Sequence, residues 1–201
     1  MSRPALAAAA ALAAVLSGCF GQLPQVPEDR FYRLGEPALP AEVPKPDIDG
    51  SIAVARPYSD GLHTERAILY ATAEQPLRVM RHHYDFWADS PPVLVQEHLV
   101  EFLRRAGVGD SVVRSESALD RALLIEPRLE RFERMLGTGD DGDQVAVALE
   151  FTIRGKHQEP LVTGYRVRQP VRGEGMYATV QAFDAALTDI YLRLLRDLAA
   201  R

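Results

Sequence analysis

Hydrophobic and polar positions alternate in two stretches of the C-terminal half of the chain. In residues 144–154 every second side chain is apolar, and the same alternation returns in residues 161–167. A period of two residues directs one set of side chains to a core and the other to solvent. The short loops expected at residues 137–143 and 155–160 are typical of hairpins, so the pattern predicts an antiparallel meander.

A period of 3.6 residues marks two amphipathic helices. The first begins at Ser90-Pro91-Pro92, because serine caps free N–H groups and proline suits the first turn, and it ends at Gly107. Its apolar stripe consists of Val95, Leu99, Phe102, Leu103 and Ala106. The second helix closes the chain, and its stripe lies opposite Asp184, Asp189, Arg193 and Arg196. That stripe consists of Phe183, Leu187, Ile190, Tyr191, Leu194 and Leu198.

Shorter β-prone runs, separated by proline and glycine, complete the folded part. They lie at residues 52–55, 67–70, 77–80, 112–113 and 122–132, the last interrupted at Pro127. Residues 31–34 form an apolar island that would add a strand at the edge. The order of elements predicts an α+β fold, with a mainly antiparallel sheet and the two amphipathic helices packed on one face.

The first nineteen residues predict a lipoprotein signal. A basic start precedes an eleven-residue apolar run at residues 5–15, whereas a helix needs about 20 residues to span a bilayer. The run ends in Leu16-Ser17-Gly18-Cys19, which resembles the bacterial lipobox. Cleavage before Cys19 would leave this residue carrying a diacylglycerol and an N-acyl chain. An inert, buried thiol is the alternative, and the coincidence of charge, run length and cysteine favours lipidation.

The residues after Cys19 indicate a destination and a tether. By resemblance to the sorting of Gram-negative lipoproteins, Phe20 in place of an aspartate favours the outer membrane. Six prolines between residues 21 and 50 disfavour helix and central strand. We therefore expect a signal peptide at residues 1–18, a lipidated, proline-rich tether at residues 19–50 and one domain at residues 51–201.

Charge and cysteine content exclude several classes of protein. The chain has 23 Lys and Arg against 28 Asp and Glu, a net charge of −5, and no basic block, which argues against nucleic-acid binding. A single cysteine excludes an intramolecular disulfide and any multi-cysteine metal site.

No residue pattern predicts catalysis or a metal site. The nucleophile-elbow, zincin, P-loop and dinucleotide motifs are absent from the sequence. Residues 140–143 read Asp-Asp-Gly-Asp between predicted strands, which indicates a hairpin turn rather than a calcium loop. His82 and His83 are adjacent and would point to opposite faces of a strand. The other histidines lack the spacing of metal ligands: His63, His98 and His157.

An aromatic cluster before the first helix has two interpretations. Trp87 and Tyr84 would suit anchors for a partner protein, since large aromatic side chains dominate many interfaces. Aromatic residues at a junction between a strand and a helix also commonly belong to the core. The position at such a junction favours the core interpretation, with a partner anchor as the alternative.

The order of these motifs resembles a known family. The lipobox is followed by Phe31-Tyr32-Arg33-Leu34, by Ile68-Leu69-Tyr70 and by Trp87-Ala88-Asp89-Ser90-Pro91 ahead of a helix. Later segments at residues 129–133 and 176–178 fit the same pattern. Together they are similar to the auxiliary lipoproteins of ABC-type lipid transport systems, specifically to the lipoprotein member of Pqi-type systems, over nearly the whole mature chain.

The resemblance implies an outer-membrane lipoprotein that faces the periplasm and docks the MCE-domain (mammalian-cell-entry) protein of an ABC-type lipid transporter. It implies no catalytic residue, and no cofactor beyond the acyl chains on Cys19. A ring of identical copies would suit a component that receives an MCE tube. Two other functions stay open: a lipid- or small-molecule-binding lipoprotein, and an envelope assembly or structural lipoprotein.

Overall fold

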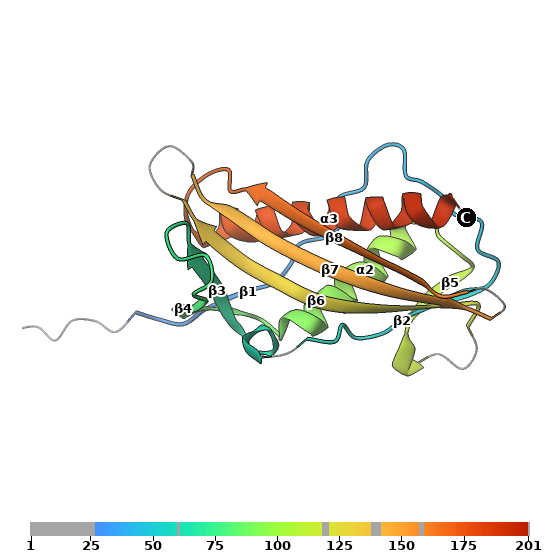
Figure 1. Cartoon of the computed structure of the whole chain (residues 1–201), viewed down its shortest axis with the longest axis horizontal. Coiled ribbons are helices and arrows are strands. Elements are labelled where there is room, and N and C mark those ends of the chain that lie inside the picture. The colour runs from blue at the N-terminus through green and yellow to red at the C-terminus, as the bar shows by residue number, and fades with distance from the viewer. Residues whose placement is uncertain (1–26, 60, 118–120, 138–141, 157–158, 201) are drawn as a thin grey trace, which may run out of the picture.

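One mixed sheet and two helices make up the fold seen in the computed structural model. Both long helices, α2 (Pro91–Ala106) and α3 (Gly175–Ala199), cover the same face of the sheet (Figure 1). The structure describes residues 27–59, 61–117, 121–137, 142–156 and 159–200. No helix within these ranges is both long and apolar enough to cross a membrane.

Several sequence predictions concern residues outside the described ranges. The signal peptide of residues 1–18 and the cysteine that follows it are among them. So are parts of two predicted loops. The individual residues are Leu16, Ser17, Gly18, Cys19, Phe20, Asp140, Asp141 and His157.

The long strand β6 (Leu123–Leu136) organises the sheet. One side of β6 pairs along its length with β7 (Gln144–Gly155), which in turn pairs with β8 (Leu161–Pro170), and both pairings are antiparallel. The other side of β6 meets two strands in succession, first β2 (Ser51–Val54) and then β3 (Ala67–Thr72), both in parallel. The meander predicted from the alternating pattern is therefore present and forms one half of the sheet.

The remaining strands extend the sheet beyond β2 and β3. β5 (Ser111–Arg114) pairs with β2, while β4 (Met80–Trp87) pairs with β3 and carries β1 (Arg30–Tyr32) on its outer side. Two short 3₁₀ helices, η2 (Gly61–Thr64) and η3 (Ser115–Ser117), lie in the connections.

The α+β class is confirmed, but the prediction of a mainly antiparallel sheet is wrong. Four of the seven pairings among the described strands are parallel: β1–β4, β2–β5, β2–β6 and β3–β6. A parallel pair joins segments far apart in the chain, as where Val54 lies beside Ile125. Alternation along one strand contains no information about which strand lies next to it or in which direction that strand runs.

Helix α2 forms where its signals predict. Pro91 and Pro92 occupy the first turn, and Gly107 ends the helix with a φ of 64°, a left-handed conformation that glycine adopts without strain. Ser90 is the N-cap residue, although its side chain makes no capping hydrogen bond. Its carbonyl oxygen instead accepts hydrogen bonds from the N–H groups of Val93 and Leu94.

Three aromatic rings from three elements meet in the centre of the core. Trp87 of β4 lies 5.2 Å from Phe132 of β6 and 5.4 Å from Phe183 of α3, measured between ring centroids. The Trp87 residue is 1% exposed. Its indole therefore does not reach the surface, which agrees with the interpretation of Trp87 as a core residue rather than a partner anchor. Tyr84 is 36% exposed on the same strand.

The third predicted strand is displaced along the chain. The sequence pattern favours residues 77–80, whereas β4 begins at Met80 and continues to Trp87, and Leu77 is exposed in the preceding turn. Polar residues inside β4 interrupt the apolar pattern from which a strand is predicted. One of them, Asp85, is buried and accepts hydrogen bonds from the Arg30 guanidinium at 3.0 Å and the Tyr32 hydroxyl at 3.1 Å.

Residues 33–50 pack on the domain instead of forming a free tether. Pro37 and Pro46 are buried, and four apolar side chains of this segment pack against the core: Leu34, Leu39, Val43 and Ile48. Proline holds the backbone extended, while the apolar side chains between the prolines still contact the domain. The folded unit therefore includes β1 and residues 33–50, and in the sequence residues 20–29 form the connection between Cys19 and β1.

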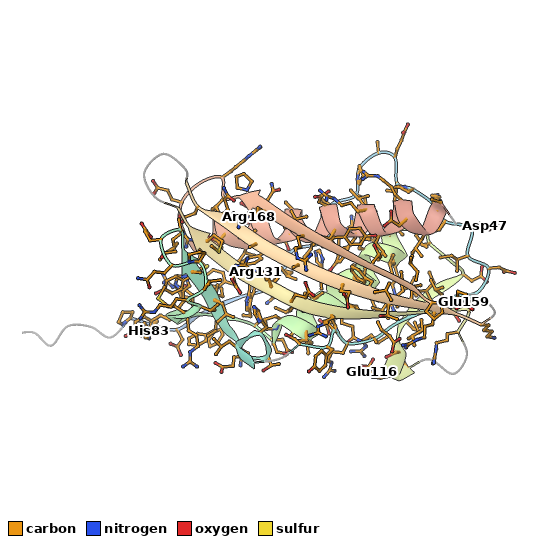
Figure 2. The ribbon with its side chains drawn as sticks, in the orientation of Figure 1. Asp47, His83, Glu116, Arg131, Glu159 and Arg168 are labelled. Atoms are coloured by element: carbon orange, nitrogen blue, oxygen red, sulfur yellow. The ribbon has the colours of Figure 1, made fainter. Side chains whose placement is uncertain are left out.

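The sheet face turned away from the helices carries charged side chains. Arg131 and Arg168 lie on this face, on β6 and β8 (Figure 2). Arg131 donates a hydrogen bond to the buried carboxylate of Glu133 at 2.9 Å, and His63 Nε2 lies 3.2 Å from the other oxygen of that carboxylate. These contacts satisfy the Glu133 carboxylate, and they hold the pKa of Glu133 below its usual value against the opposing effect of burial.

Candidate functional site

A groove lies between α2 and α3, bordered by the segment that follows β1. We call residues 33–39 the strap and the cavity between the strap and the two helices the helix groove. The helix groove has a volume of about 610 Å³. A second hollow of about 430 Å³ adjoins it along α3 and shares Glu36, Gln181 and Asp184 with it.

The strap is fixed to both helices. The Gly35 N–H donates to both carboxylate oxygens of Asp184 on α3, each at 3.1 Å. Glu36 forms an ion pair with Arg105 of α2 at 3.0 Å. A Cβ atom at residue 35 would lie 3.0 Å from Asp184 Oδ2, so glycine permits the close approach of the strap to the carboxylate.

A buried histidine faces the same carboxylate. The His98 side chain on α2 is 3% exposed, and neither ring nitrogen has a hydrogen-bond partner. Its Nε2 lies 3.7 Å from Asp184 Oδ1. Burial lowers the pKa of His98 to about 4, so the imidazole is neutral at pH 7.

The environment of Asp184 disfavours its charge. Burial raises the pKa of Asp184 to about 6, although the hydrogen bond from the Gly35 N–H acts in the opposite direction. At pH 7 the two groups are therefore a neutral imidazole beside a carboxylate rather than an ion pair. Buried titratable groups with displaced pKa values are typical of functional sites.

The rim of the helix groove is acidic and its interior is largely apolar. Four carboxylates line the groove against one guanidinium, that of Arg33. Tyr177 stands at the edge and is 70% exposed. The acidic residues are Glu36, Glu97, Glu101 and Asp184, and the aliphatic ones are Leu34, Pro37, Leu94 and Val180. This arrangement suits the binding of a group that is partly apolar and carries positive charge.

Asp184→Asn is expected to stabilise the protein at pH 7.5 by about 1–3 kcal/mol, since each pKa unit corresponds to about 1.4 kcal/mol and residual solvent screening reduces the effect. The folded-state pKa lies above the unfolded value, so ionisation of Asp184 opposes folding. This cost is absent below about pH 3.8 and fully present above about pH 6. Urea unfolding at pH 5 and pH 7.5 measures the effect.

The control for this prediction is Asp189→Asn on the same helix, whose carboxylate is half-exposed and pairs with Arg193. As the pH falls from 7.5 to 5, the free energy of unfolding of the wild-type protein should rise relative to that of Asp184→Asn. The Asp189→Asn variant should show the same pH dependence as the wild type. Identical pH dependence of the wild type and Asp184→Asn would contradict the assignment.

Two of the predicted site residues, Trp87 and Tyr84, lie in the described part of the chain, and the structure brings neither into the helix groove. Trp87 lies in the core and Tyr84 on β4, and neither lines the cavity. Within the described ranges, no three histidine, cysteine or acidic side chains are grouped as a metal site would require.

Sequence reasoning missed His98 and Asp184 as a pair. They are 86 positions apart on different helices, and only the packing of α2 against α3 brings them together. The one signal in the sequence is a histidine within the apolar stripe of the first helix, next to Leu99.

The chain matches the family of ABC-type transport auxiliary lipoprotein components over residues 32–193. The protein therefore belongs to this family, as its motif order predicts. The matched region begins within β1 and includes the strap, which agrees with a folded unit that starts ahead of residue 51. Among curated proteins, none matches this chain.

Solved structures share the fold. A crystal structure of a Xanthomonas campestris protein has a TM-score of 0.68 at 18% identity and covers 83% of this chain and 92% of its own. A second crystal structure, of an uncharacterized protein, has a TM-score of 0.68 at 12% identity, with 85% and 99% covered. A hypothetical protein of Chlamydia trachomatis reaches 0.50 at 9% identity, with 76% and 99% covered. At these identities the similarity concerns the fold alone.

Proposed function

We propose that the protein is the docking lipoprotein of an MCE/ABC-type intermembrane lipid transport system. Lipidated Cys19 anchors it in the outer membrane, the domain faces the periplasm, and it catalyses no reaction. Membership in the ABC-type transport auxiliary lipoprotein family over residues 32–193 carries this proposal. The lipobox and the short connection at residues 20–29 support the anchored position.

The chemistry of the helix groove supports binding rather than catalysis. The groove pairs one imidazole with one carboxylate, and no serine, threonine or cysteine is among the described residues that line it. An acid–base pair acts in covalent catalysis by activating a nucleophile beside it. The same pair surrounded by aliphatic side chains and carboxylates suits recognition of a partner.

Genetic epistasis tests the proposed function. If the lipoprotein and the MCE-domain protein act in one transport system, deleting both genes should make cells no more sensitive to detergent than deleting either gene alone. A deletion in an unrelated envelope pathway serves as the control and should add to the sensitivity. Additive sensitivity in the double deletion of lipoprotein and MCE genes would contradict the proposal.

A second candidate function is direct binding of a lipid or small molecule. The observation that favours it is the size of the helix groove, since about 610 Å³ falls within the range of ligand pockets. Native mass spectrometry of the protein, purified with and without delipidation, distinguishes this function from docking. A stoichiometric bound ligand would favour it, and a mass equal to that of the lipoprotein alone would argue against it.

A further inference from the structure

The acidic rim of the helix groove indicates the charge of its occupant. Glu97 and Glu101 lie one turn apart on the exposed side of α2, and Asp184 faces them from α3. Glu101 has no ion-pair or hydrogen-bond partner within the described part of the chain, and Glu97 reaches Arg114 only at 3.9 Å. Carboxylates gathered around one cavity repel one another, and a cation between them relieves that repulsion.

The apolar surface beside these carboxylates is elongated. It begins at Tyr177 and Val180 in the helix groove and continues along α3 into the adjoining hollow. There the helix lines the hollow with exposed Ala185 and half-buried Thr188 and Leu192, which follow one another at intervals of three or four positions. Such a strip matches the apolar face of an extended or helical peptide better than a compact small molecule.

His98 is a second, independent indication of a ligand. A buried imidazole without a hydrogen-bond partner destabilises a fold, and the ring contact of His98 with Tyr191, 5.7 Å between centroids, satisfies neither nitrogen. The 3.7 Å between His98 Nε2 and Asp184 Oδ1 is too long for a hydrogen bond. An N–H group of a lysine or arginine side chain in the helix groove would reach the Asp184 carboxylate, whose side chain is 21% exposed, beside the ring of His98.

We propose that the helix groove docks a basic, amphipathic segment of a transport-system subunit. Its lysine or arginine side chains bind Glu97, Glu101 and Asp184, and its apolar side chains cover Val180 and Tyr177. An anionic lipid is disfavoured, because its phosphate would lie among carboxylates. This inference rests on the proposed docking function and adds to it the location and the chemistry of the contact.

Site-specific photo-cross-linking of the full-length lipoprotein in cells tests this surface. Benzoylphenylalanine replaces Gln181, which lines both hollows, and in a control it replaces Val162, which is exposed on β8 outside them. We expect position 181 to cross-link a segment of the MCE-domain protein that contains lysine or arginine, as identified by peptide mass spectrometry. The yield at position 162 should be at least tenfold lower.

Charge reversal separates the carboxylates from general packing. Glu97→Lys with Glu101→Lys should reduce the cross-link at position 181 at least tenfold, and the milder pair Glu97→Gln with Glu101→Gln should reduce it in part. Glu42→Lys with Glu74→Lys changes the net charge equally at exposed positions outside the helix groove and should leave the yield unchanged.

Three results would overturn the inference. They are an undiminished cross-link in the Glu97/Glu101 variants, a cross-link from position 181 to lipid or to an acidic segment, and no cross-link at position 181. Co-purification of the transport subunits with the unmodified lipoprotein distinguishes the two proposals. If co-purification persists in any of these cases, the docking function stands and only its assignment to the helix groove fails.

Discussion

Replacing Trp87 with alanine is expected to lower the free energy of unfolding by about 3–5 kcal/mol, the range for removing a buried aromatic side chain. The indole contacts Phe132 and Phe183, so the substitution leaves a cavity where β4, β6 and α3 meet. Cavity formation adds to the lost hydrophobic transfer energy because a packed core relaxes only in part. Urea denaturation, followed by circular dichroism, measures the change.

The matched control is Tyr84→Ala on the same strand. Because this side chain is partly exposed and does not belong to the aromatic cluster, its loss is expected to cost about 1 kcal/mol or less. A destabilisation by Trp87→Ala as small as that of Tyr84→Ala would contradict the core position of the indole. If Tyr84 is instead a partner contact, Tyr84→Ala should weaken co-purification of a partner while leaving the unfolding midpoint nearly unchanged.

Replacing Cys19 with alanine is expected to abolish lipidation and remove the protein from the outer-membrane fraction. Each buried methylene of an acyl chain contributes about 0.8 kcal/mol, so a diacylglycerol and an N-acyl chain together anchor the protein stably on the membrane. Without the thiol there is no thioether, and the precursor should remain uncleaved at this site. Metabolic labelling with radioactive palmitate, gel mobility and membrane fractionation report the three effects.

The control for Cys19→Ala is a shuffled order of residues 22–25, which keeps the lipobox and the length of the connection. This variant should be labelled, cleaved and recovered with the outer membrane like the wild type. Function should be lost with the anchor and kept in the shuffled variant. Rescue of a deletion strain by a secreted, unlipidated form would contradict the requirement for anchoring.

The elements themselves could be predicted wherever one local pattern determines them. The alternation in residues 144–154 corresponds to β7, and the Ser90-Pro91-Pro92 start and the Gly107 stop coincide with the ends of α2. In each case the side chains that form the pattern also form the element's buried face. By contrast, β4 contains His82, His83 and Asp85, and its buried polar contacts depend on Arg30 and Tyr32, which lie far away in sequence.

The arrangement of the elements depends on contacts that no local pattern contains. Parallel pairing of β2 and β3 with β6 requires crossover connections between distant segments. The hydrophobic pattern of a strand is the same whichever strand lies next to it. The strap could not be predicted for the same reason. The prolines around Leu34 and Leu39 predict a linker, whereas the apolar side chains pack on the core through long-range contacts. The His98–Asp184 pair is a product of the same long-range packing.

We propose that this lipoprotein docks a transport subunit at the outer membrane. The most direct test is affinity purification of the tagged, full-length protein from gently solubilised envelopes, with inner and outer membranes separated from the same preparation. We expect the protein to be recovered from the outer membrane together with an MCE-domain protein, and Cys19→Ala to abolish this recovery. Recovery from the inner membrane, or from the outer membrane without an MCE-domain protein in cells that produce one, would contradict it.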